Sequence, residues 1–351
     1  MSEKAQDRKK KHIWTILFIL LNTAVIAATA VNEFSGSSAH KIEFAFSKRA
    51  LFYLACTGMC LAVLFCAESL KYLLMMRSLG ERVSFRAAFE TAALGKYYDC
   101  ITPSGTGGQP FQIHWLHKQG YSDGAASAMT IAGYITMQAG FIFLAAGVFI
   151  AWRSVELEVI RYTAYFGLLL FSLIPFLLAL FSFMPNTVRK IISAVIRLCG
   201  KLKLVKKPEE TTERVVGMLG SYHKSFSAIK KDKATLLLLL LLSLVYRIAL
   251  CSMPFFVLKM FGAPASFFHV FATTIYIYAS IALVPTPGNA GAAEGAFYLV
   301  FSAMGSEGVF WAMLIWRIFC HYSFILAGAA IYGVNALRGK RLRGGEKDEP
   351  A

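Results

Sequence analysis

Charged side chains inside apolar stretches are the residues of this sequence best suited to chemistry. Arg247 lies near the middle of the apolar run 234–258, and Arg317 lies about two turns into the run 309–334. His321 follows Arg317 by four positions, so the two side chains share one face of a helix. A charge at the centre of a membrane span costs about 2.5–3.5 kcal/mol, and such residues usually serve function. We expect both arginines to bind the phosphate of a ligand through their planar guanidinium forks.

Two breaks rich in glycine and proline interrupt apolar stretches in the same way, at 102–109 and at 286–294. Glycine lets backbone N–H groups face a ligand, and a helix that begins after each proline would direct its positive dipole end at an anion. The expected ligand contacts are Thr102, Pro103, Ser104, Gly105, Thr106, Gly107, Gly108 and Gln109 in the first break, and Thr286, Pro287, Gly288, Asn289, Gly291 and Glu294 in the second. The alternative is that small residues only permit close packing between helices.

Lys96 and Asp99, which precede the first break, have several open roles. They could bind a polar head group, relay protons, or satisfy the broken backbone. The arginines also have an alternative role, because a structural ion pair of either one with Glu294 or Glu68 would explain a buried charge without any ligand.

The surroundings of the two breaks match as well, which indicates a duplicated chain. A shift of 182 positions lays Gly80, Ser84, Phe85, Phe89 and Thr91 on Gly262, Ser266, Phe267, Phe271 and Thr273, and a shift of 184 lays Thr102, Pro103 and Gly107 on Thr286, Pro287 and Gly291. The charges are not duplicated, since Gly133 and Met137 stand where the second half has Arg317 and His321. Duplicated halves that each carry a broken membrane segment are typical of transporters that bind substrate where the repeats meet.

The composition predicts an all-α polytopic membrane protein. Hydrophobic residues make up 57% of the 351 residues, the mean hydropathy is +0.56, and the apolar residues come in blocks of about twenty, the length of a spanning helix. The expected full spans are 13–31, 51–67 or 51–76, 124–150, 162–183, 234–258 and 309–334. Near the expected membrane interfaces, we expect the side chains of Glu68, Lys71 and Glu90 to be solvated.

The distribution of basic residues predicts the topology. Segment 4–11 holds five Lys and Arg residues, 184–233 holds twelve, and 338–347 holds five, which places all three in the cytoplasm. The formal charge of +16 therefore reflects membrane topology rather than nucleic-acid binding. The broken segments 87–118 and 268–305 must then be re-entrant hairpins that enter from opposite faces.

One membrane domain, 1–351, is therefore expected, with inverted repeats at 51–150 and 234–334. The first apolar run resembles a signal peptide, but it is about 19 residues long, enough to span, and we expect it to be retained. In the segment 184–233, Val188 and Ile191 share a helical face opposite basic residues, which predicts an interfacial helix attracted to anionic lipid. A solvated linker helix is the alternative.

Enzyme signatures are absent from the sequence. There is no H-E-x-x-H, G-x-S-x-G or P-loop motif, and the seven cysteines form no C-x-x-C pair. We expect no catalytic residues, no metal and no cofactor.

The motif 102–112 with His114–Lys118 after it, and the motif 284–295, together resemble the lysylphosphatidylglycerol synthase transmembrane-region family. That family includes the flippase half of the multiple peptide resistance factor, which links it to antimicrobial peptide resistance. The resemblance covers nearly the whole chain. It implies movement of a phospholipid or aminoacylated phospholipid head group between leaflets along the hairpin motifs. A soluble synthase domain follows the membrane region in bifunctional members, and we expect no aminoacyl transfer from a chain that stops at Ala351.

The preferred interpretation is an inverted-repeat lipid translocase of the cell membrane with both termini cytoplasmic. A small-solute transporter that uses Glu294 and Asp99 for ion coupling is one alternative. A membrane partner of a separately encoded synthase, docked through 184–233, is another. An oligomer is compatible with the sequence, and a nucleic-acid partner is not expected.

Overall fold

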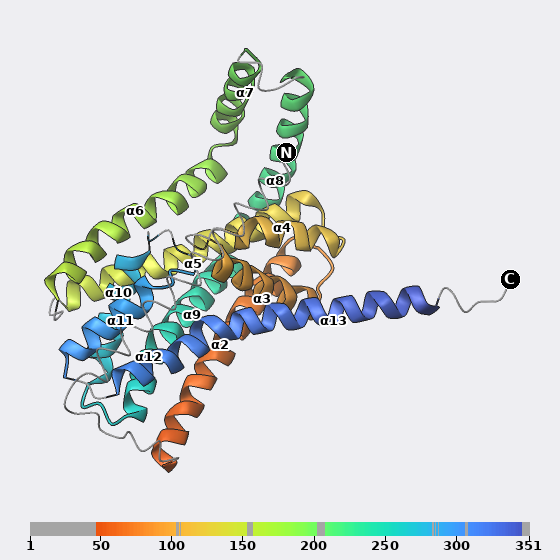
Figure 1. Ribbon diagram of the computed structural model, residues 1–351. Coiled ribbons are helices and arrows are strands. Elements are labelled where there is room, and N and C mark those ends of the chain that lie inside the picture. Colours follow the sequence, from red (N-terminus) through yellow and green to blue (C-terminus); the bar gives the residue numbers. More distant parts are fainter. Residues whose placement is uncertain are drawn as a thin grey trace, which may run out of the picture.

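The computed structural model describes residues 47–345 except 103, 104, 106, 153–156, 202–207, 283, 285, 287, 306 and 307, and this part of the chain is all-helical (Figure 1). Five helices in it are long and apolar enough to cross a membrane: α2 (Lys48–Ser78), α5 (Asp123–Ala151), α6 (Glu158–Phe183), α9 (Lys233–Met260) and the continuous helix Val309–Asn335. The predicted fold class, an all-α polytopic membrane protein, is confirmed. The predicted span 13–31 lies outside the described residues.

Each predicted hairpin contains a pair of short helices. The first consists of α3 (Phe85–Ile101) and α4 (Gly108–Lys118), and the second of α10 (Phe267–Ile281) and α11 (Ala292–Ala303). The longest of the four, α3, has 17 residues, and at about 1.5 Å per residue it is roughly 25 Å long. A hydrocarbon core of about 30 Å is thicker than that, so none of these helices reaches across on its own. We call the two pairs hairpin 1 and hairpin 2.

Local structure repeats at the predicted offset of 182 residues. Ser84 accepts a hydrogen bond from the backbone of Ala87 at the start of α3, and Ser266 accepts one from His269 at the start of α10. Both serines are helix N-caps, which satisfy N–H groups that lack intrahelical partners. The two halves therefore begin their hairpins with the same local structure.

α2 and α9 hold equivalent places in the two halves and run antiparallel. A Cβ atom added to Gly262, just after α9, would lie 3.0 Å from Nη2 of Arg49 at the start of α2. At the other end, Asp232 caps α9 and lies beside Ser78, the last residue of α2. Hydrogen bonds from Thr235 lower the pKa of the Asp232 carboxyl. Antiparallel pairing of equivalent helices is the arrangement expected of inverted repeats.

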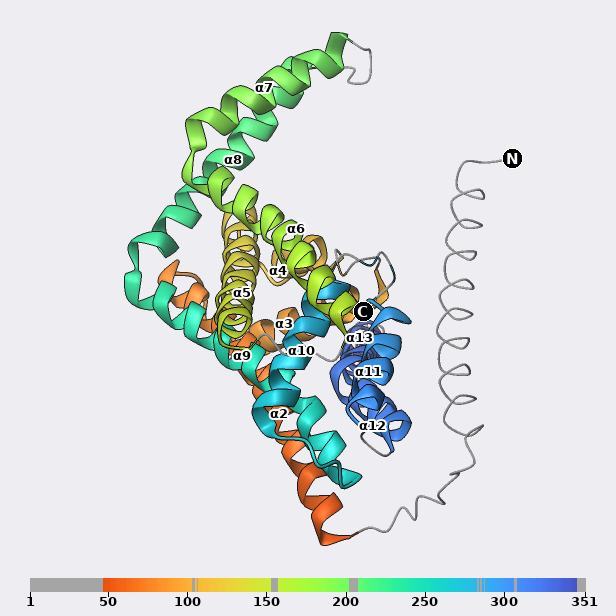
Figure 2. The ribbon, with the colours of Figure 1, turned by 90° about the vertical axis from the view of Figure 1, so that its left-hand side faces the viewer.

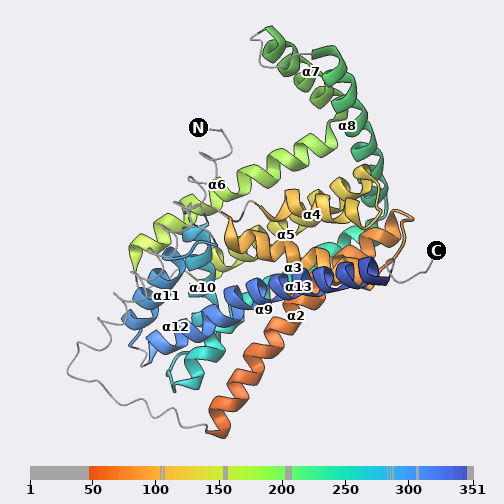
Figure 3. The ribbon, with the colours of Figure 1, turned by 45° about the vertical axis from the view of Figure 1, so that its right-hand side comes forward.

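The hairpins lie toward opposite ends of the bundle. In Figures 1 and 3, α3 and α4 lie toward the end reached by α8 and the far end of α13, whereas α10 and α11 lie toward the other end. The last long helix is divided into α12 (Val309–Arg317), a π-helical turn η1 (Ile318–Tyr322) and α13 (Ser323–Gly345).

The main apolar core surrounds α9 and hairpin 2, where Met253 and Val257 are fully buried and the rings of Phe297 and Trp316 stack with centroids 4.8 Å apart. By contrast, α6 exposes large apolar side chains such as Phe166 and Leu169. An exposed apolar stripe of this kind is what acyl chains would cover.

The segment predicted as one amphipathic loop, 184–233, is a pair of helices, α7 (Pro185–Lys201) and α8 (Pro208–Lys231). They lie side by side and extend away from the bundle (Figures 1 and 2). α8 returns to the bundle through buried Tyr222, whose hydroxyl contacts that of Ser182 on α6. On α7, Ile191 is exposed and the neighbouring Arg189 and Lys190 are exposed as well.

Candidate ligand-binding site

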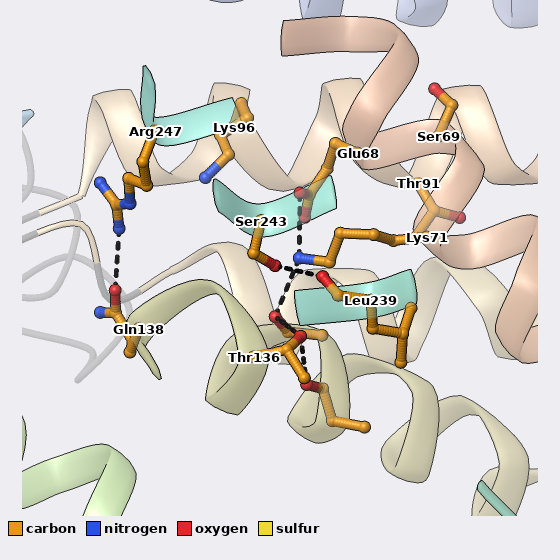
Figure 4. Close-up of polar contacts among 12 residues, drawn as sticks. Glu68, Ser69, Lys71, Thr91, Lys96, Thr136, Gln138, Leu239, Ser243 and Arg247 are labelled. Atoms are coloured by element: carbon orange, nitrogen blue, oxygen red, sulfur yellow. Dashed lines mark hydrogen bonds and ion pairs between the residues drawn. The ribbon is translucent and has the colours of Figure 1, made fainter. Parts of the chain in front are cut away.

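Charged side chains from α2, α3 and α9 and an amide side chain from α5 meet inside the bundle (Figure 4). We call this group the polar centre. Its members are Glu68 and Lys71 on α2, Lys96 and Asp99 on α3, Gln138 on α5 and Arg247 on α9.

Glu68 and Lys71 form a closed pair at the α2 side of the polar centre. The Lys71 ammonium lies 3.2 Å from Glu68 Oε2 and donates a second hydrogen bond to the carbonyl oxygen of Gly133 at 3.0 Å. The side chains are 0% and 9% exposed. A buried ammonium is tolerated only where a carboxylate and further acceptors surround it, and this one is so surrounded.

Lys96 and Asp99 form a looser pair at the edge of the polar centre. Their charged atoms are 3.6 Å apart, and each side chain keeps 23% exposure. The Lys96 ammonium also lies 5.2 Å from the centre of the Tyr246 ring, within cation–π range. This pair is therefore longer and less fully covered than the pair of Glu68 and Lys71.

Arg247 is the charged residue of the polar centre that lacks an acidic partner. Its Nη2 donates to Oε1 of Gln138 at 2.8 Å, and its guanidinium lies 4.9 Å from the centre of the Phe141 ring. Its Nε is buried and has no hydrogen-bond partner. In the described ranges no carboxylate lies within 4.0 Å of this guanidinium. A guanidinium has five N–H donors, so Arg247 keeps unused capacity for an anion.

The break of hairpin 1 satisfies its own backbone. The Thr102 hydroxyl donates to the carbonyl of Tyr98 at 2.7 Å and accepts from the Gly107 N–H at 2.9 Å, and Asp99 Oδ1 accepts from the Gly108 N–H at 3.0 Å. In the structure the Gly107 and Gly108 N–H groups therefore face side-chain caps from the same hairpin. Their contact with a ligand stays a prediction.

The remaining residues of that break give less information about a ligand. Gly105 adopts a positive φ of 62°, which glycine permits without strain, and Gln109 is half-buried. Three further predicted contacts, Pro103, Ser104 and Thr106, lie outside the described residues.

The break of hairpin 2 is closed by a buried ion pair. Arg317 Nε lies 2.5 Å from Glu294 Oε1, with side chains 6% and 2% exposed, and Glu294 Oε2 accepts from the Gly291 N–H at 2.7 Å. Arg317 Nη2 also donates to the carbonyl of Gly288 at 3.5 Å. Each of these groups thus has a buried partner within the protein, as the alternative of a structural ion pair expects, and contact of Arg317, Glu294 or the Gly291 N–H with a ligand stays a prediction.

Asn289 and Thr286 complete this break. Asn289 has a positive φ of 55° and its side-chain amide donates to the carbonyl of Ile281 at 3.0 Å, so it stabilises the turn. The buried Thr286 hydroxyl has no hydrogen-bond partner among the described atoms. The predicted contact Pro287 lies outside the described residues.

The two breaks touch each other. A Cβ atom added to Gly288 in hairpin 2 would lie 3.0 Å from the carbonyl oxygen of Cys100 in hairpin 1 and 2.3 Å from Cε1 of His321. His321 and Arg317 both reach Gly288, consistent with their spacing, and His321 sits in the π-helical turn η1. Such turns are frequent at functional sites.

For three members of the polar centre, Glu68, Lys71 and Gln138, the sequence does not predict a place in the site. The expectation that Glu68, Lys71 and Glu90 are solvated is wrong, because all three are buried. The physical reason for the first two is that α2 continues to Ser78, which carries them into the bundle. The spacing of three residues, which puts Glu68 and Lys71 on one helical face, was the available signal. Gln138 carries no charge, and nothing in the sequence marked it.

No group of three or more His, Cys, Asp or Glu side chains placed to ligate a metal ion occurs in the described part of the chain. The polar centre instead offers cations and hydrogen-bond donors, which suit an oxyanion such as a phosphate.

Comparison with known proteins links this architecture to a membrane family. The family described as lysylphosphatidylglycerol synthase TM region matches residues 13–328. A UPF0104 membrane protein of Archaeoglobus fulgidus is similar, with 24% identity over 282 residues that cover 78% of this chain and 83% of the relative. The family match extends over hairpin 1, hairpin 2 and the polar centre, so it concerns the membrane bundle as a whole.

Proposed function

The chain belongs to the lysylphosphatidylglycerol synthase transmembrane-region family, and from this premise we propose that it is a lipid translocase. A phospholipid head group would cross the bilayer through the polar centre while its acyl chains stay in the hydrocarbon region. The family relation concerns the membrane region, and no aminoacyl-transfer step is proposed for this chain.

The observation that carries the proposal is Arg247, a charged side chain inside the bundle without a carboxylate partner. Water hydrates a head-group phosphate outside the membrane, so a translocase must replace that hydration with fixed donors. Arg247 supplies unused N–H donors. We propose that a head group enters past Lys96 and Asp99, because this pair is the less fully covered of the two ion pairs in the polar centre.

The arrangement of the repeats supports the same function. α2 and α9 are antiparallel, the hairpins lie toward opposite ends, and their breaks meet at Gly288 and Cys100. Transporters built from inverted repeats place their substrate sites near the bilayer midplane between broken helices. Rocking of one hairpin against the other would expose the polar centre first to one leaflet and then to the other.

The orientation is part of the proposal. The basic helices α7 and α8 and the far end of α13 lie at one end of the bundle (Figures 1 and 3), and we assign this end and both termini to the cytoplasm of a cell-membrane protein. Anionic lipid is the proposed partner of α7, whose exposed Arg189 and Lys190 adjoin exposed Ile191.

The alternative of an ion-coupled solute transporter needs acidic residues that can change their partners. Glu294 is already held by Arg317 and by the Gly291 N–H, which leaves Asp99 as the carboxylate available for coupling. The lipid proposal uses the unpaired Arg247 directly, so we prefer it.

A leaflet-exchange assay tests the proposed function. The purified full chain is reconstituted into vesicles with lipids labelled in the head group, and loss of label from the outer leaflet is followed with an impermeant quencher. We expect exchange well above that of protein-free vesicles. Exchange equal to that of protein-free vesicles, from a correctly folded protein, would refute the translocase assignment.

A further inference from the structure

We infer that the polar centre selects a phosphodiester head group with one net negative charge, and that Arg247 determines this selection. The inference rests on the proposed function and adds the substrate class to it. The argument depends on how the charges of the polar centre are already paired.

Two of the three cationic side chains have their own carboxylate. Lys71 is paired with Glu68 at 3.2 Å, and Lys96 is paired with Asp99 at 3.6 Å. Each pair contributes no net charge. Arg247 remains, so the polar centre carries one uncompensated positive charge.

The surroundings of Arg247 make this charge costly in the absence of an anion. Gln138 is neutral, and the Phe141 ring offers only the partial negative charge of its face. Lys71 and Lys96 also lie within electrostatic range of Arg247, but each stands beside its own carboxylate and adds no net charge. Arg247 is partly buried, with its Nε fully buried. An ion of opposite sign stabilises a charge in such a position, and a single negative charge is enough to neutralise the site.

The free donors of Arg247 also suit a phosphodiester. Gln138 occupies Nη2, while Nε has no partner. A phosphodiester has two non-bridging oxygens that share one negative charge, and a guanidinium binds such a pair with two parallel hydrogen bonds. Lys96, at the exposed edge, is placed to contact the same group from α3.

Head groups with other net charges fit less well. A zwitterionic head group adds an ammonium, and this ammonium could pair with Asp99 only by displacing Lys96, which would leave Lys96 as a second unpaired cation in the polar centre. A phosphomonoester with two negative charges would bring one charge that the polar centre does not neutralise. The order expected is therefore a monoanionic phosphodiester first, with zwitterionic lipids and phosphomonoester lipids well below it.

The test compares lipids of one chain length and different head groups in the leaflet-exchange assay, in vesicles of phosphatidylcholine. The probes are labelled phosphatidylglycerol, phosphatidylethanolamine and phosphatidic acid. We expect the exchange of phosphatidylglycerol to be tenfold or more faster than that of the other two. R247Q should slow phosphatidylglycerol exchange by tenfold or more and abolish the preference, because one charged hydrogen-bonding partner is lost.

Two further variants separate charge from shape and from general damage. R247K keeps the positive charge without the fork, so it should retain the preference at a lower rate. R161Q removes an exposed arginine of α6, far from the polar centre in sequence and paired with Glu158, and should leave both rate and preference unchanged. Equal exchange of all three lipids by the wild-type protein would overturn the charge selection while leaving the translocase function standing.

A binding measurement keeps the inference testable if no lipid is exchanged. Binding of dihexanoyl phosphatidylglycerol to the detergent-purified protein is compared with that of dihexanoyl phosphatidylcholine and of glycerophosphoglycerol, the same head group without acyl chains. Preferential binding of the first, lost in R247Q, would uphold the charge selection even though the translocase proposal had failed. Equal binding of the two lipids would overturn it, and equally tight binding of glycerophosphoglycerol would identify a soluble anion rather than a lipid as the ligand.

Discussion

The two hairpins occupy equivalent places in the repeats but use their charges differently. In hairpin 2, Glu294 and Arg317 form a buried pair at 2.5 Å that joins the break to the last long helix. In hairpin 1, Asp99 and Lys96 form a partly exposed pair at 3.6 Å beside the unpaired Arg247. Both carboxylates cap a glycine N–H at the break. In both hairpins, therefore, a carboxylate caps the backbone of the break. The ion pair of that carboxylate is buried in hairpin 2 and partly exposed in hairpin 1.

This difference assigns separate roles to the hairpins. A break whose charges are satisfied internally adds stability and rigidity, because separating a buried pair leaves an uncompensated charge. A break whose pair is loose and exposed can exchange partners with a ligand. We therefore expect substitutions in hairpin 2 to affect folding, and substitutions around hairpin 1 to affect lipid movement.

The largest effect is expected from R317Q. Breaking a buried ion pair by removing one partner costs about 3–5 kcal/mol, because Glu294 is left buried without a counter-charge. Thermal or denaturant unfolding in detergent, followed by tryptophan fluorescence, measures the loss. Adding E294Q should restore part of it, as in a double-mutant cycle. A stable R317Q that fails only in lipid exchange would mean that hairpin 2 binds the ligand after all.

A matched control for that experiment is the exposed pair of Glu158 and Arg161, 3.0 Å apart at the start of α6. Exposed pairs contribute about 0–1 kcal/mol, so R161Q should shift the unfolding midpoint little.

G288A is expected to destabilise the protein by about 2–4 kcal/mol, more than G105A in hairpin 1. Both glycines have positive φ, which alone costs an L-residue about 1–2 kcal/mol. At Gly288 the new methyl group would also collide with His321 at 2.3 Å, whereas at Gly105 the nearest atom is 3.7 Å away. Unfolding midpoints compare the two variants. Equal losses of stability in G288A and G105A would mean that Gly288 is not packed tightly against His321.

R247Q is expected to change function rather than folding. Loss of the charged contact should weaken lipid binding by about 1.5–3 kcal/mol, while the unfolding midpoint stays near that of the wild type, because no carboxylate is left unpaired. Lipid exchange and unfolding are measured on one preparation. If R247Q lowered the unfolding midpoint as much as R317Q, Arg247 would have a structural role like that of Arg317, and the proposed difference between the two arginines would be wrong.

The smallest and most equal effects are expected from S84A and S266A. Each removes the N-cap of the first helix of a hairpin, which typically costs about 1 kcal/mol. Because the local structure is the same in both halves, the two losses in unfolding free energy should agree. A large difference between the two losses would mean that the hairpins differ in their local backbone structure and not only in their ion pairs.

Several features of the fold could be predicted from the sequence because they depend on local properties. Five spans follow from the length of apolar runs. The breaks predicted at 102–109 and 286–294 from glycine and proline overlap the observed interruptions at 102–107 and 282–291, because the backbone preferences of these residues act within a few positions. The N-caps at Ser84 and Ser266 reappeared at the predicted offset of the repeat for the same reason. The family assignment is also confirmed, since the motifs that carry it are contiguous in sequence.

The pairing of charges was decided only by the tertiary structure. Arg247 and Arg317 have the same sequence context, a cation inside an apolar run, and the sequence left phosphate binding and ion pairing open for both. Arg317 forms an ion pair with Glu294 because α11 folds back against α12. Arg247 instead donates a hydrogen bond to Gln138, a neutral residue 109 positions away. Charge and hydropathy can be read from neighbouring residues in the sequence. Whether a charge is neutralised depends on which helices pack together, and the whole fold determines that.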